Sequence, residues 1–172
     1  MPSPSKKPTS VARLTRGALL TAIALTIFMV EAQIPAPIPI PGVKLGLANI
    51  ITIYAMYVLG PADTLLILVS RIFLGAVFSG QMMTLLYSLG GGLSCYVAML
   101  LLRKIIPKDY LWLSSAISAV FHNLGQLLVA AGVMKTWAVL AYLPYLMLAG
   151  VCAGLFTGLC TQFLVRRLDQ IG

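Results

Sequence analysis

The sequence predicts an all-α integral membrane protein, a compact bundle of six transmembrane helices. The first observation is composition: of 172 residues, 60% are hydrophobic and 9% are charged, with a mean hydropathy of +0.98. Soluble domains carry about 25% charged residues. A chain of this length cannot bury so much apolar surface in its own interior, so the excess must face lipid. The second observation is that the apolar residues fall into six segments, and the third is that basic residues cluster between them.

Each element follows from the order of apolar and polar residues. Residues 1–14 are rich in Pro, Ser and Lys, and we expect a disordered basic tail followed by a single membrane domain, residues 15–170. A spanning helix needs about 20 residues. Six segments are predicted to span: 17–34, 45–60, 62–79, 82–102, 111–133 and 137–165. The second is short, so its first turn is expected to begin below the outer surface. The sixth contains Pro144, which predicts a kink or a tilted start.

The basic residues predict the orientation. Nine of the twelve Lys and Arg lie in short runs that flank the apolar segments at alternate ends: Lys6, Lys7, Arg13, Arg16, Arg103, Lys104, Lys108, Arg166 and Arg167. Because cytoplasmic loops carry an excess of Lys and Arg, we expect a multi-pass protein of the cytoplasmic membrane with both termini inside. Lys44 and Lys135 then lie outside and Arg71 within the membrane. A nucleic-acid binder would instead gather its charge on one face.

Residues 6–32 have a second interpretation, as a signal peptide that ends in the cleavage sequence Val30-Glu31-Ala32. Its removal would upset the agreement between the number of spans and the distribution of charge. We therefore expect the first span to be retained.

Motifs for catalysis are missing from the sequence. The four acidic residues lie far apart: Glu31, Asp63, Asp109 and Asp169. There is no DDxxD pair to hold Mg²⁺ on a diphosphate, and no P-loop, GxSxG or HExxH motif. The three cysteines lie in apolar runs without the spacing of a zinc site or a disulfide framework: Cys95, Cys152 and Cys160. We expect no catalytic activity, no cofactor and no metal.

Polar residues within or beside the predicted spans indicate a binding site. Ionisable groups in a bilayer are costly and tend to face a cavity or a partner. Three of the polar residues share one face near the middle of the fifth span, because their spacing is helical. We expect seven side chains to meet around one outward-facing pocket and bind substrate: Glu31, Lys44, Asn49, Arg71, His122, Asn123 and Gln126.

Structural roles are the alternatives for these residues. Arg71 could pair with Glu31, and His122 could bond the backbone of a neighbouring helix. Asn123 and Gln126 could hold helices together. Lys44 and Glu31 could simply extend to the membrane interface.

Three further features concern packing. Residues Ile34–Gly42 carry proline at alternate positions and cannot be helical; we expect a stiff outer strap, either a lid over the polar residues or a plain connector. The triplet Gly90–Gly92 favours close helix approach. Ala18 and Ala22, with Ala24 beside them, form a face of small residues suited to packing within the chain or with a partner.

Four parts of the sequence resemble the Gx transporter family, whose members are often labelled heptaprenyl diphosphate synthase component I: Pro41–Asn49, Arg71, Tyr87–Gly91 and His122–Gln126. That family is similar to the substrate-binding S components of energy-coupling factor transporters for vitamins. The resemblance implies a compact six-helix fold with a cavity opening outward. It also implies that Ala18 and Ala22 dock onto a transmembrane coupling subunit, which works with ATPases.

Two classes of function remain open, with a third behind them. The first is an S-component-like subunit that captures a small vitamin-like or precursor-like molecule for uptake; two cations against one acid favour a neutral or weakly anionic ligand. The alternative is a non-catalytic membrane accessory of a prenyl diphosphate synthase, or of a quinone or flavin pathway enzyme. The third is a proton-coupled carrier in which His122 changes its protonation.

Overall fold

The computed structural model describes residues 10–34, 44 and 46–171, and this part of the chain is helical, without a strand. Six α-helices follow one another: α1 (Ser10–Glu31), α2 (Asn49–Val58), α3 (Pro61–Ser79), α4 (Met82–Leu102), α5 (Leu111–Met134) and α6 (Leu143–Ile171). Two short 3-10 helices, η1 (Lys108–Tyr110) and η2 (Trp137–Tyr142), precede α5 and α6. All of the α-helices except α2 are long and apolar enough to cross a membrane. The chain is thus a multi-pass membrane protein.

The predicted span 45–60 is wrong as a full-length helix. α2 has 10 residues, and at 1.5 Å per residue it covers about 15 Å, roughly half of the hydrocarbon core. Its first helical residue is Asn49. That this helix begins below the outer surface stays a prediction.

Two other boundaries also differ from the prediction. α1 begins at Ser10, so residues 10–14 are helical and do not belong to the tail. The last segment is divided: residues 137–142 are a 3-10 helix, and α6 then runs from Leu143 to Ile171. Pro144 is the second residue of α6, where its missing N–H has no helical partner to lose.

Residues with positive φ close the turns between antiparallel helices. Gly60 (φ 103°) precedes Pro61 at the start of α3, and Gly80 (φ 65°) ends that helix in the left-handed conformation. Lys135 (φ 51°) ends α5 in the same way. Glycine adopts positive φ without the steric penalty of a side chain. The glycines at positions 60 and 80 therefore explain why the chain turns there.

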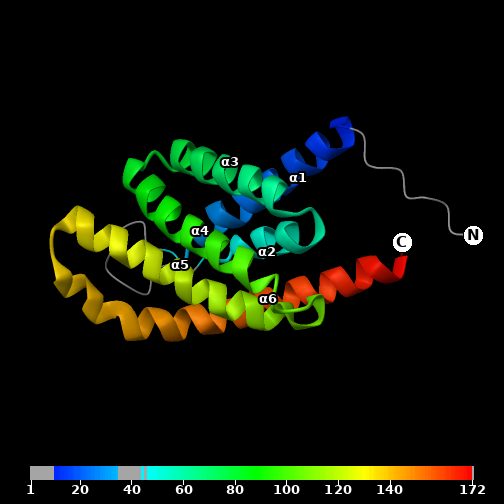
Figure 1. Cartoon of the computed structure of the whole chain (residues 1–172). Coiled ribbons are helices and arrows are strands. Elements are labelled where there is room, and N and C mark those ends of the chain that lie inside the picture. The colour runs from blue at the N-terminus through cyan, green and yellow to red at the C-terminus, as the bar shows by residue number, and fades with distance from the viewer. Residues whose placement is uncertain (1–9, 35–43, 45, 172) are drawn as a thin grey trace, which may run out of the picture.

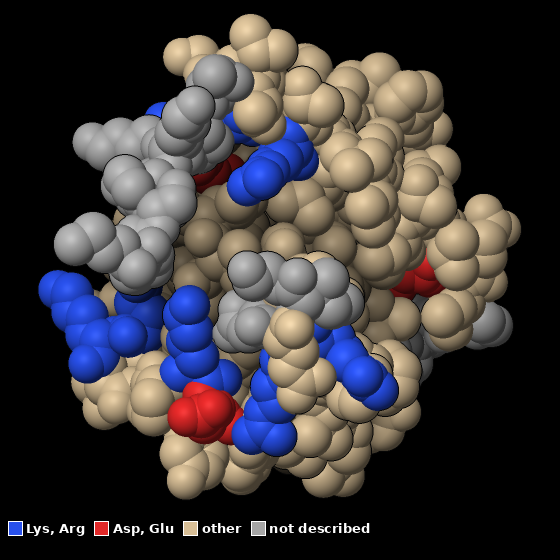
Figure 2. All heavy atoms as spheres, turned by 90° about the vertical axis from the view of Figure 1, so that its right-hand side faces the viewer, with Lys and Arg blue, Asp and Glu red and all other residues tan. Residues whose placement is uncertain are grey.

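Both ends of the described chain lie at one end of the bundle, together with the α2–α3 and α4–α5 connections (Figure 1). Exposed basic side chains gather there: Arg13, Arg16, Arg103, Lys104, Lys108, Arg166 and Arg167. Figure 2 looks onto this basic end and shows Lys and Arg around a hollow in the surface. The N-termini of α1 and α3 are joined here by an ion pair between Arg13 Nη2 and Asp63 Oδ1, 2.6 Å apart.

Helices α4, α5 and α6 pack through small residues. A Cβ atom on Gly91 would lie 2.9 Å from the carbonyl oxygen of His122, and Gly90 faces Gly125 across the same contact. The expected packing role of the glycine triplet is therefore confirmed. On α6, three glycines spaced four apart face α5: Gly150, Gly154 and Gly158. A Cβ on Gly154 would lie 2.7 Å from the Cα of Ala116, so side chains larger than hydrogen have no room at this contact.

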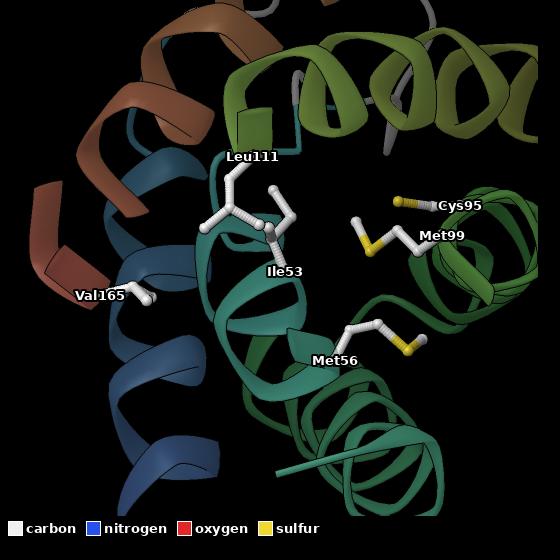
Figure 3. Close-up of a cluster of buried hydrophobic side chains, with 6 residues drawn as sticks. All are labelled: Ile53, Met56, Cys95, Met99, Leu111 and Val165. Atoms are coloured by element: carbon white, nitrogen blue, oxygen red, sulfur yellow. The ribbon is translucent and has the colours of Figure 1, made fainter. Parts of the chain in front are cut away.

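An apolar cluster fills the bundle between α2, α4, α5 and α6 (Figure 3). Its members are Ile53, Met56, Cys95, Met99, Leu111 and Val165. Their packing ties the half-length helix α2 to three of the long helices.

Some expectations fall on residues outside the described part of the chain. They are the tail up to residue 9 and the proline-containing strap, of which only Ile34 is described.

Candidate functional site

The site is built around the start of α2. Asn49 and Arg71 lie eleven residues on either side of the turn at Gly60. Because α2 and α3 run antiparallel from that turn, equal spacing places the two residues at the same depth. Asn49 and Arg71 are both buried, with 5% and 3% of their surface exposed. The half-length helix therefore begins beside a buried arginine in the interior of the bundle.

Glu31 holds the segment that leads into α2. It is the last residue of α1, and its carboxylate Oε1 accepts the N–H of Gly46 at 2.6 Å. A carboxylate near a helix N-terminus is stabilised by the helix dipole and by its charge-assisted hydrogen bond. The ion pair that could have neutralised Arg71 is not formed: among the described residues, Arg13–Asp63 is the one ion pair within 4.0 Å. Glu31 interacts with Lys44 and Arg71 at longer range.

An aromatic ring lies beside the two cations. Lys44 Nζ is 3.4 Å from the centre of the Phe28 ring, and Arg71 Cζ is 6.0 Å from it. Lys44 precedes α2, outside the apolar helices. Burial lowers the pKa of its ammonium group, Glu31 raises it and Arg71 lowers it further. Lys44 is thus a half-buried cation that contacts an aromatic ring and forms no ion pair within 4.0 Å with a described carboxylate.

His122 and Gln126 close the site from α5. Gln126 Oε1 accepts the backbone N–H of Lys44 at 3.4 Å. A Cβ on Gly46 would lie 3.1 Å from His122 Nε2 and 2.8 Å from the side-chain nitrogen of Asn49. The glycine at this position, with φ 84°, lets the segment approach the imidazole.

The structure brings together six of the seven candidate residues, which we call the interior polar cluster: Glu31, Lys44, Asn49, Arg71, His122 and Gln126. Asn123 faces the other way. Its Nδ2 donates to the carbonyl oxygen of Leu146 on α6 at 2.6 Å, the helix-linking contact considered as its structural alternative.

Several buried polar atoms of this cluster have no hydrogen-bond partner among the described residues: Asn49 Oδ1, Arg71 Nε, and both ring nitrogens of His122. Buried polar groups are nearly always paired, and an unpaired one costs about 1–3 kcal/mol. Four such atoms from three helices, beside two cations, form an arrangement that polar atoms of a bound molecule can satisfy.

Ala18 and Ala22 lie on an exposed face of α1, whereas Ala24 is buried against the bundle. The two alanines predicted to dock a partner are thus free of contacts that would bury them within the described chain.

Residues 20–164 match the family described as heptaprenyl diphosphate synthase component I. The chain belongs to this family. The match includes every member of the interior polar cluster and also Asn123. No curated protein and no solved structure matches the chain. The family description names a component of a synthase, and the described residues contain no group of three His, Cys, Asp or Glu that could hold a metal ion.

Two residues beside the interior polar cluster, Phe28 and Gly46, were not among the site residues predicted from the sequence. Phe28 lies three residues before Glu31, on the same face of α1. Its helical spacing from a buried acid is the signal that could have found it. Gly46 was quoted only as part of a motif; its role beside His122 depends on a close approach that spacing alone does not reveal.

Proposed function

We propose that the chain is the substrate-capturing, S-component-like subunit of a small-molecule uptake system. The observation that carries this proposal is the interior polar cluster, whose unpaired atoms surround the start of a half-length helix. Asn49, Arg71 and His122 would bind the molecule, and Glu31 and Gln126 would position the segment before α2.

The chemistry of the cluster supports capture over a purely structural role. A polar network that serves stability alone is most favourable when every group is paired. Within the described part of the chain, however, Arg71 Nε and both ring nitrogens of His122 have no hydrogen-bond partner. Helices that begin inside the membrane direct a positive dipole end at the site, a recurring device of transporter binding sites. We propose this role for α2, whose first residue, Asn49, belongs to the interior polar cluster.

The arrangement of the chain in the membrane belongs to the same proposal. The basic end faces the cytoplasm, by the positive-inside rule, so both termini are cytoplasmic and the chain crosses six times, with α2 completing the second crossing. α1 is retained, because it supplies Phe28 and Glu31. The exposed Ala18 and Ala22 face would dock a transmembrane coupling subunit that works with ATPases.

Capture is tested by native mass spectrometry of protein extracted gently from membranes. We expect a small molecule to remain bound to the wild type and to be lost from Arg71→Ala. The matched control is Arg16→Ala, which removes an exposed arginine at the basic end. Uptake of the labelled molecule by membranes carrying each variant should follow the same order. A wild type that retains nothing, or an Arg71→Ala variant that retains as much, contradicts capture.

A non-catalytic accessory role in prenyl diphosphate synthesis is the second candidate, favoured by the description of the family. It predicts that a soluble synthase co-purifies with the chain and makes more product in its presence. Stimulation that persists in Arg71→Ala, together with absence of uptake, would favour this role over capture.

A further inference from the structure

The charge of the interior polar cluster is unbalanced among the described residues. Counted by formal charge, Lys44 and Arg71 contribute two positive charges and Glu31 one negative charge, with His122 neutral. The other described acidic side chains lie elsewhere: Asp63 pairs with Arg13 at the basic end, and Asp109 is exposed in η1. One positive charge is left over beside the start of α2, whose dipole adds to it.

The single acid of the cluster is already engaged. Glu31 Oε1 accepts the Gly46 N–H at 2.6 Å, and Glu31 forms no ion pair within 4.0 Å with either cation. Lys44 Nζ rests on the Phe28 ring at 3.4 Å. A cation–π contact is worth about 0.5–2 kcal/mol, so an anion is a stronger partner for a half-buried ammonium group.

The unpaired atoms specify the shape of that anion. Arg71 Nε can only donate, so its partner must be an acceptor. The planar guanidinium group presents its N–H groups in a fork that matches a carboxylate. Neutral His122 offers one donor and one acceptor, and Asn49 Oδ1 accepts. These atoms fit a second, hydroxyl-like or amide-like part of the same molecule.

We infer that the captured molecule is a small organic monoanion, whose carboxylate lies between Arg71 and Lys44 and whose neutral polar group faces His122 and Asn49. This inference rests on the proposed function and narrows its substrate class. One negative charge neutralises the cluster, whereas a neutral molecule leaves a net charge in the membrane interior, where charge is costly.

Binding of benzoate and benzamide tests the charge directly, because the two probes share a shape and differ in charge at neutral pH. In lipid nanodiscs we expect benzoate to raise the melting temperature of the wild type and benzamide to leave it unchanged. Arg71→Gln should weaken the apparent affinity for benzoate at least tenfold, and the exposed control Arg16→Gln should keep it. Equal stabilisation by benzamide, no response to benzoate, or an unaltered response of Arg71→Gln overturns the inference.

The unliganded protein gives a second test, which does not depend on the probe. Lys44→Gln removes the surplus charge and should raise the melting temperature, whereas Glu31→Gln increases the surplus and should lower it. The opposite order overturns the inference. A neutral molecule found in the native mass spectrum would also overturn it while leaving capture intact, whereas finding no captured molecule contradicts capture itself.

Discussion

The two ends of α2 lie in opposite surroundings. Asn49, at its start, lies in the interior polar cluster, whereas Ile53 and Met56, one and two turns later, are fully enclosed by the apolar cluster (Figure 3). Both regions are buried, and the same short helix joins them. The interior polar cluster contains polar atoms without hydrogen-bond partners among the described residues, and the apolar cluster contains side chains that need no such partner.

The difference separates residues that stabilise the bundle from residues that we propose bind a molecule. In the apolar cluster each side chain fills space that would otherwise be empty, so its loss leaves a cavity. In the interior polar cluster several side chains lack partners and contribute less stability than their burial suggests. Substitutions in the two regions should therefore change different measured quantities.

The largest expected effect is on stability, from Leu111→Ala in the apolar cluster. Leu111 is fully buried, and truncation of such a residue costs about 2–5 kcal/mol. Unfolding in mixed micelles measures the loss, and native mass spectrometry should find the captured molecule still bound. Leu113→Ala is the matched control, since Leu113 lies on the same helix with 38% of its surface exposed. Equal losses from the two variants would contradict the assignment of Leu111 to the core.

Gly46→Ala should affect both the stability of the protein and its capture of a molecule. Its φ of 84° makes a side chain strained, at about 1–2 kcal/mol, and the new methyl group would lie 3.1 Å from His122 Nε2. We expect lower stability together with loss of the captured molecule. Gly132→Ala is the control, because its added methyl group would meet no described atom within 4 Å beyond its chain neighbours and its own helix backbone. Full retention in Gly46→Ala would show that the segment does not form part of the site.

Asn123→Ala should separate two neighbours in the sequence. It removes the hydrogen bond to Leu146 on α6, and interhelical hydrogen bonds in membranes are worth about 1 kcal/mol. We expect this modest loss of stability with capture preserved, whereas His122→Ala should abolish capture. Loss of capture in Asn123→Ala at unchanged stability would return Asn123 to the binding site.

The smallest expected effect is the pH dependence of stability that arises from Lys44. Because the pKa of Lys44 is lowered in the folded protein, the unfolded chain binds the proton more tightly. Stability should therefore rise with pH between this lowered pKa and the ordinary lysine value of about 10.4. The advantage of Lys44→Gln over the wild type should narrow across that range, as measured by unfolding at a series of pH values. An advantage that widens would contradict the sign of the shift.

Much of the bundle could be predicted from the sequence, because lipid imposes a simple pattern. Long apolar segments bounded by Gly60, Gly80 and basic runs gave α3, α4 and α5 nearly to the residue. The start of the half-length helix α2 could not be predicted, because the residues that precede Asn49 are also mostly apolar. The start of α1 was missed because polar residues there are still helical.

The sequence pointed to most of the residues that lie together in the interior polar cluster, and their function stays a prediction. Burial cost singled out Arg71 and His122, and helical spacing placed Gln126 beside His122. Spacing alone could not separate Asn123, which lies on the edge of the same face and turns to α6. The contact of Lys44 with Phe28 arises from a non-helical segment, whose path no periodicity describes.

The glycine-lined contacts among α4, α5 and α6 have a consequence for exchange with the surroundings. Where backbones touch without intervening side chains, rotamer changes cannot widen the gap between helices. We therefore expect these three helices, which carry His122 and Gln126, to form the rigid side of the site. In the proposed capture role, a molecule would enter and leave on the opposite side, where the Glu31–Gly46 hydrogen bond and the Lys44–Phe28 contact link α1 to the residues before α2.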